Sequence, residues 1–222
     1  MEGGVVNIRK PVLFTLLVLS GLVAGILLSN VLFTLTGISL FGGFSKKYSS
    51  TSDTGNADLT TLAYSVLEYI RDDDYTALSG VVHPEFGVVF SPCATINLST
   101  DRRFSADQIA VIDTDDKTYV WGVYNGSGEP IEMKPTDYFV EFVAAGSFAN
   151  APVIGINQIV RSGNALENIT DIFPDVEFID FHLPGGERET ADEPDWSSLR
   201  LGFEEFDGSL RLILILHSKW TV

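Results

Sequence analysis

The sequence predicts an α+β protein, in which an apolar N-terminal segment precedes one domain with early helices packed on a curved, mostly antiparallel sheet. Three observations predict this class. Apolar residues recur with helical spacing just after residue 58, alternating β-branched stretches dominate the second half, and Asp207-Gly208 joins two apolar runs near the C-terminal end. Helices that come before strands, without regular alternation, are typical of α+β domains.

The N-terminal segment has no Asp, Glu, Lys or Arg between Pro11 and Ser45. A helix of about 20 apolar residues crosses a bilayer, and residues 11–35 exceed that length. We expect a short cytoplasmic N-terminus at residues 1–10, a single-pass signal anchor at residues 11–35, and a C-terminal domain outside the cytoplasm at the cell membrane. Cleavage of the segment as a signal peptide is the alternative, although its apolar run is long for one.

A spacer rich in Ser, Thr and Gly, residues 36–57, leads to a domain over residues 58–222 whose length suits one hydrophobic core. This domain holds 28 of the 30 acidic residues but only 10 of the 14 basic ones. An acidic surface repels nucleic acid and anionic lipid headgroups, so the expected membrane contact is through residues 11–35 alone and nucleic acid is excluded as a partner. Cys93 is the only cysteine, which excludes an intramolecular disulfide.

Two helices open the domain. Residues 58–71 carry apolar side chains at i, i+3, i+4 and i+7, which predicts an amphipathic helix. The run Asp72-Asp73-Asp74 ends it, and residues 75–82 predict a second, shorter helix that stops at His83-Pro84.

Strands and short helices follow in the middle of the chain. Residues 87–99 predict a strand limited by Pro92, and Ser105 with Gln108 forms a capping box for a short helix. Residues 117–133 predict a hairpin.

A third helix and two strands complete this part. Pro135 starts a helix that Gly146 can end, and residues 151–160 and 175–183 predict two further strands.

The last two strands are predicted to form a hairpin, because Asp207-Gly208 suits a type I′ turn in which both central residues have positive φ. This turn predicts a register that pairs Phe203 with Leu212, Leu201 with Leu214 and Leu199 with Leu216. The opposite face of the last strand then carries Ile213, Ile215 and His217 together.

Patterns for cofactors and metals fail. No helix directly follows the glycine-rich residues 125–128, so they predict a turn rather than a phosphate-binding loop. The acidic run 113–116 lacks the Gly and Glu of a calcium loop, and no two of the three histidines have metal-ligand spacing. No cofactor, metal site or catalytic residue is therefore predicted.

A candidate pocket rests on residues that share strand faces. Asp180 and His182 lie two residues apart on one predicted strand, so they face the same way and could form an acid–base pair. The alternative is a solvated Asp180 and a His182 that ends its strand, while His217 closes the sheet. The candidate pocket residues are His217, Ile213, Ile215, Asp180, His182 and Trp121.

Several segments also support a resemblance. An opening helix, DDDYTALSGVVHPEFGV and a C-terminal sheet resemble the cone-shaped domain of the nuclear transport factor 2-like superfamily. HPEFGVVFSP, YVWGVYNGSGEPIE, GNALENITDIFPD, FHLPGG, DWSSLRLGFEE and HSKWTV occur in this order over nearly all of residues 58–222. In this they are similar to an uncharacterised family of exported or lipid-anchored bacterial proteins, from which this chain differs by having an apolar anchor in place of a lipidated Cys. The resemblance implies a location and a fold, with a sheet curled around a pocket, but no reaction.

Together these observations predict a membrane-anchored domain outside the cytoplasm that binds a small molecule or a peptide in the concave sheet face, without catalysis. One alternative is a small isomerase or hydrolase that uses Asp180 with His182 or His217 in the same pocket. A second alternative is a homodimeric interaction module. A roomy pocket with a buried polar pair favours the enzyme, and a filled cone favours the interaction module.

Overall fold

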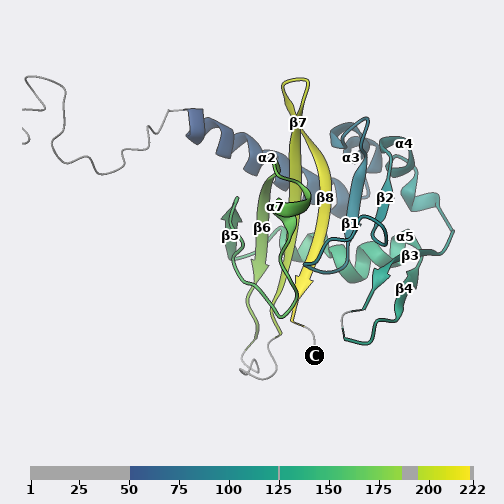
Figure 1. Cartoon of the computed structure of the whole chain (residues 1–222). Helices are drawn as coiled ribbons and strands as arrows, with labels where there is room; N and C mark the ends of the chain where they lie inside the picture. The colour runs from purple at the N-terminus through teal and green to yellow at the C-terminus, as the bar shows by residue number, and fades with distance from the viewer. Residues whose placement is uncertain (1–50, 125, 187–194, 221–222) are drawn as a thin grey trace, which may run out of the picture. The chain divides into compact units, whose positions relative to one another are not determined.

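The computed structural model describes residues 51–124, 126–186 and 195–220 (Figure 1). The described part is an α+β domain with N-terminal helices packed on a mostly antiparallel sheet, as predicted, and this sheet has six strands. The predicted anchor at residues 11–35 lies outside the described residues. Within the described ranges, no helix is both long enough and apolar enough to cross a membrane.

The two opening helices agree with the sequence pattern. Helix α2 spans Thr51–Arg71 and α3 spans Tyr75–Val81. The predicted apolar stripe of α2 faces the core, where Leu59 and Val66 are fully buried. The Asp74 carboxylate accepts a hydrogen bond of 2.9 Å from the Ala77 N–H and so caps α3, which explains why the acidic run separates the helices.

Short elements follow α3. Helix α4 (Ala106–Ile109) has the predicted capping box between Ser105 and Gln108, and a 3₁₀ turn, η1 (Ile112–Thr114), comes after it. Strands β3 (Tyr119–Val123) and β4 (Pro130–Met133) form the predicted hairpin as a separate two-stranded sheet. The remaining helical elements are α5 (Pro135–Tyr138), the π-helix η2 (Phe139–Val143), α6 (Ala145–Phe148) and α7 (Ile169–Ile172).

The large sheet has the strand order β2-β1-β8-β7-β6-β5. Its strands are β1 (Val88–Ser91), β2 (Arg102–Phe104), β5 (Val153–Ile156), β6 (Glu177–Leu183), β7 (Ser197–Phe206) and β8 (Ser209–Lys219). All neighbours pair antiparallel except β1 and β8, which are parallel. The sequence did not predict β2, α7 or this parallel pair, which joins segments far apart in the chain.

Both faces of the central strands are covered. In Figure 1, α2 crosses behind the strands and α7 lies in front of them. The larger core packs α2, α3, η2 and α6 on one face, which we call the helix face. Ile169 and Phe173 pack with Ile213, Leu214 and Leu216 on the other face, which we call the strap face because the chain around α7 crosses it. The apolar run of β8 therefore belongs to a strand that is buried on both sides.

The C-terminal hairpin has the predicted turn, but its predicted register holds only near that turn. Asp207 and Gly208 have φ values of 51° and 74°, and Phe203 pairs with Leu212. A bulge between Gly202 and Phe203 then shifts the register, so that Leu201 pairs with Ile215 and Leu199 with His217.

The predicted pairs Leu201–Leu214 and Leu199–Leu216 are therefore wrong. The bulge occurs where Gly202 lies against Leu214, since a Cβ at Gly202 would come within 3.0 Å of the Leu214 Cβ. One extra residue on β8 reverses the face of every side chain beyond it.

Candidate functional site

The register shift divides the candidate pocket residues between the two faces of the sheet. Ile215 and His217 lie on the helix face, whereas Ile213 belongs to the cluster on the strap face. Asp180 lies on the strap face, because it pairs with Arg200 of β7, and Arg200 pairs with Leu216 of that face. The expectation that Ile213, Ile215 and His217 share one face is thus wrong, and the six candidates do not converge on one cavity.

His217 is part of the main core. Its side chain packs edge-on against Phe142 and Phe148, with ring centroids 5.7 and 6.4 Å away. Burial, with a smaller contribution from the Lys219 ammonium, lowers the pKa of His217 from 6.5 to about 4, although a hydrogen bond to the Pro92 backbone opposes this change. The imidazole is therefore neutral at physiological pH.

Trp121 also lies within the helix-face core. Its indole N–H donates a 3.0 Å hydrogen bond to the Met133 carbonyl, and its ring stacks on Tyr138 at 3.9 Å. Phe90 meets the same indole edge-on at 5.5 Å. Aromatic rings therefore fill the space around Trp121 in the helix-face core.

Asp180 and His182 share the strap face, as their spacing predicts, but each has a structural partner. Asp180 is fully buried, and its Oδ2 accepts hydrogen bonds from the Val160 N–H at 2.9 Å and from Arg200 Nε at 3.2 Å. His182 Nδ1 lies 2.9 Å from the Ser198 hydroxyl. This carboxylate is therefore held by a cation and a backbone amide, an arrangement that suits a structural ion pair rather than a general base.

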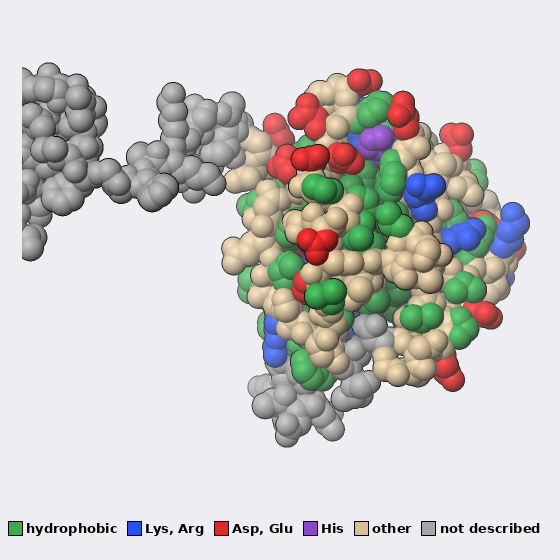
Figure 2. All heavy atoms as spheres, in the orientation of Figure 1, with side chains coloured by type: hydrophobic (Ala, Val, Ile, Leu, Met, Phe, Trp, Pro, Cys, Tyr) green, Lys and Arg blue, Asp and Glu red, His purple; other side chains and the backbone are tan. Residues whose placement is uncertain are grey.

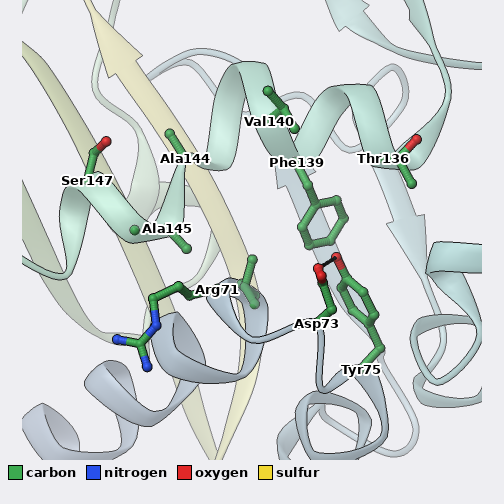
Figure 3. A pocket seen from close by; sticks show the side chains of 11 residues that line it. Arg71, Asp73, Tyr75, Thr136, Phe139, Val140, Ala144, Ala145 and Ser147 are labelled. Carbon is green, nitrogen blue, oxygen red and sulfur yellow. Dashed lines mark hydrogen bonds between the residues drawn. The ribbon is translucent and has the colours of Figure 1, made fainter.

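A different part of the molecule offers an accessible cavity. A hollow of about 530 Å³ lies between the end of α2, the start of α3 and the α5–η2–α6 segment (Figure 3). Its lining combines an apolar floor with charged and hydroxyl groups at the rim. The lining residues are Ile70, Arg71, Asp73, Tyr75, Thr136, Phe139, Val140, Ala144, Ala145, Gly146 and Ser147.

Unusual backbone conformations shape this hollow on both sides. Asp73 and Ala144 have φ values of 55° and 43°, in the left-handed region that residues other than glycine seldom adopt. The Ala144 N–H donates a 2.8 Å hydrogen bond to the Phe139 carbonyl, which closes the π-helix η2. Left-handed residues and π-helices are both frequent at functional sites.

The end of this helical segment differs from the prediction. Gly146 was expected to end a helix that starts at Pro135, but the left-handed residue is Ala144, and Gly146 lies inside α6. The wider π turn leaves Val140 79% exposed beside the hollow while Phe139 remains buried.

Polar groups of the hollow are arranged around Tyr75, which lies beneath Phe139 in Figure 3. The two rings meet edge-on with centroids 5.6 Å apart, and the Tyr75 hydroxyl donates a 3.3 Å hydrogen bond to Asp73 Oδ1. Burial and the negative charges of Asp73 and Asp113 raise the pKa of Tyr75 to about 12. The phenol is therefore protonated at neutral pH and acts as a fixed donor.

Arg71 lies at the other end of the hollow and already has a partner. Its Nε and Nη2 donate hydrogen bonds of 2.8 and 3.0 Å to the two carboxylate oxygens of Asp72. Across the described ranges, no group of three or more His, Cys, Asp and Glu is arranged to hold a metal ion. The hollow thus combines an apolar floor with a few polar groups.

Comparison with known proteins does not identify a family, because no family model matches the chain and no curated protein matches it.

The hollow was not predicted from the sequence. Asp72-Asp73-Asp74 predicted only the end of a helix, although an acidic run next to a tyrosine at a helix–helix turn is a signal that could have marked Asp73 and Tyr75 as neighbours. Nothing in the sequence marks Ala144 as left-handed.

Proposed function

We propose that this protein is a membrane-anchored domain outside the cytoplasm that binds a small molecule or a peptide, without catalysis, in the hollow beside η2. The hollow itself is the observation that carries the proposal. Ligand sites are typically concave, of about 300–1,000 Å³, with mostly apolar walls and a few polar groups that orient the ligand. The lining around Phe139, Asp73 and Tyr75 has this composition.

The location within the fold is part of the same proposal. Early helices on one face of a mostly antiparallel sheet support a nuclear transport factor 2-like domain as part of the proposal. In that fold the ligand would enter the concave sheet face, but here the rings of Phe90, Trp121 and Tyr138 fill that region. The proposed site is therefore at the edge of the helical layer.

The acidic surface of the domain supports the proposal that it contacts neither nucleic acid nor anionic lipid headgroups. Figure 2 shows acidic side chains gathered at the end of the domain that carries the β7–β8 turn. Anchoring would then depend on residues 11–35. Protease accessibility of the full chain in intact cells tests this topology, since a domain outside the cytoplasm is digested without lysis and a cytoplasmic one is protected.

Binding is tested with the full chain in lipid nanodiscs, in a thermal-shift screen of metabolites and short peptides. The Thr136→Trp variant places an indole at the rim of the hollow, where Thr136 is exposed, and should abolish the shift of a true ligand. Thr61→Trp is the matched control, because Thr61 is an exposed residue of α2 that does not line the hollow. A ligand shift that survives Thr136→Trp would contradict the proposed site.

Two observations favour homodimerisation as a second candidate function. The rings of Phe90, Trp121 and Tyr138 fill the region between helices and sheet, which favours an interaction module over a ligand pocket there. Strand β5 is an edge of the sheet, and Val153 and Ile156 on it are 43% and 38% exposed. Unpaired edge strands are templates for pairing with another chain. Sedimentation of the full chain in detergent tests this candidate, because Val153→Lys should dissociate a dimer that forms through β5 and leave any other dimer intact.

A further inference from the structure

The hollow beside η2 has an uneven charge distribution. Arg71, its one cation, is bound by both carboxylate oxygens of Asp72 and also lies near Glu68. Asp73, by contrast, has no cationic partner at ion-pair distance within the described residues and accepts only the Tyr75 hydroxyl. The carboxylate of Asp73 is therefore the uncompensated charge of this site.

The surroundings of Tyr75 indicate the sign of the local field. Asp73 and Asp113 both act on the Tyr75 phenol, and both disfavour its ionised form. Charges that disfavour an anion at this position favour a cation there, because the same Coulomb interaction acts with the opposite sign. An anionic ligand would meet this field and would also have to compete with Asp72 for Arg71.

The rest of the hollow is largely apolar. Ile70, Phe139, Ala144 and Ala145 line it, and Val140 presents an exposed isopropyl group beside them. An apolar group placed there loses contact with water, which is favourable in proportion to the area that is buried. The site thus offers a carboxylate and a hydroxyl at one end and an apolar wall next to them.

We infer that the hollow selects an organic ammonium ion that carries an apolar substituent, with Asp73 as the residue that recognises the cation. This inference rests on the proposed function of the same hollow. The ammonium group would lie against Asp73, with the Tyr75 hydroxyl holding the carboxylate in place, and the substituent would pack on Phe139 and Ala145. Either a free amine or the amino terminus of a peptide presents this chemistry.

Three five-carbon probes test the inference on the full chain in nanodiscs. Pentylammonium, pentanol and pentanoate have a cationic, a neutral and an anionic head group on an unbranched alkyl chain, and saturation-transfer NMR compares their affinities. We expect pentylammonium to bind about 2- to 5-fold more tightly than pentanol, because a charge pair with the exposed Asp73 contributes only a modest amount, and pentanoate to bind most weakly. The preference should decrease as salt is raised.

The Asp73→Asn variant is the decisive comparison. Asn tolerates the left-handed conformation of Asp73, so the turn is retained while the charge is removed. We expect the preference of pentylammonium over pentanol to fall to about equal affinity. Asp137→Asn is the matched control, because Asp137 is an exposed residue of α5 that does not line the hollow, and it should leave the preference unchanged.

The outcomes separate this inference from the proposed function. Equal binding of the three probes, blocked by Thr136→Trp, would overturn cation selection and retain the binding site. Preferred binding of pentanoate would overturn it in favour of recognition by Arg71. Absence of binding by every probe would overturn both.

The source of the amine is tested with a dipeptide amide that carries a free or an acetylated amino terminus. Preference for the free form supports the inference with a peptide as the ligand. Binding of pentylammonium but of neither peptide supports it with a free amine as the ligand.

Discussion

Replacement of Arg200 by Met should destabilise the domain severely, because this arginine neutralises buried carboxylates on the strap face. Its side chain is fully buried and donates to Asp180, to both carboxylate oxygens of Glu167 and, at 3.3 Å, to the Arg161 carbonyl. Asp180 is itself fully buried, and Glu167 is 15% exposed. Arg200→Met therefore leaves one carboxylate without its cation in the interior.

The expected loss is about 3–5 kcal/mol in the free energy of unfolding, which is typical when one partner of a buried ion pair is removed. For a domain of this size, each kcal/mol lowers the melting temperature by about 2–4 °C, so the expected decrease is roughly 6–20 °C. Because Met largely preserves the volume of the arginine side chain, the loss of stability comes more from the unpaired carboxylate than from a cavity.

Chemical and thermal unfolding of the full chain in detergent measure this effect. Arg103→Met is the matched control, because Arg103 is exposed on β2 and the loss of its contact with the Phe86 ring should cost about 1 kcal/mol or less. Asp180→Asn in the Arg200→Met background should recover part of the stability, since it removes the stranded charge.

Hydrogen exchange gives a local readout of the same change. The Val160 N–H donates to Asp180 and should exchange faster in Arg200→Met than in the unmodified chain. A loss below about 1 kcal/mol in Arg200→Met, with unchanged exchange at Val160, would refute the reasoning.

Four further variants test other parts of the fold. In the unmodified chain, the free energy of unfolding should fall by about 3 kcal/mol as pH decreases from 6.5 to about 4, because the unfolded imidazole of His217 binds a proton in this window and the folded one does not. His217→Gln should lack this decrease, and the difference between the two pH profiles of unfolding measures it. Gly155→Ala should destabilise the domain by more than about 1 kcal/mol, since the new Cβ would overlap the Gln158 carbonyl. By contrast, the Cβ of Gly80→Ala in α3 would meet no atom within 4 Å, so this variant should stabilise the domain by about 0.5–1 kcal/mol; thermal unfolding measures both changes. Ser105→Ala should cost about 1 kcal/mol in urea unfolding, because it removes the cap of α4, and an unchanged midpoint would contradict that role.

Local sequence signals predicted the elements that depend on neighbours in the chain. The apolar spacing of α2, the capping box at Ser105 and the turn at Asp207-Gly208 all rest on residues within a few positions of one another. The parallel pairing of β1 with β8 has no such signal, because Val89 and Leu214 meet only after the chain has folded. Strand order between distant segments is therefore the part of the fold that the sequence left open.

The candidate pocket failed to assemble for a related reason. Turn chemistry determines register for the first pairs of a hairpin, but the bulge lies further along the strands, where Gly202 packs against the side chains of Leu214 and Val176. That single step moved His217 to the helix face and left Ile213 on the strap face. A face assignment along a long strand is thus only as good as the assumption that no bulge intervenes.

The hollow beside η2 could not be derived from residue types either, because its shape comes from backbone conformations that the sequence disguises. Ala144 takes the left-handed position that the nearby Gly146 would be expected to take, and the π turn that ends there keeps Phe139 inward.

The same packing explains why the sheet itself is an unsuitable site. Arg200 and Asp180 would be a reactive or ligand-binding pair only if the strap face were open, but the chain from Val160 to Glu167 bonds to both and closes it. With rings filling the helix face and the strap covering the other, recognition at the sheet would require part of the core to open. Asp73 and Tyr75 require no such opening, and for this reason the search for a ligand should begin with Asp73→Asn.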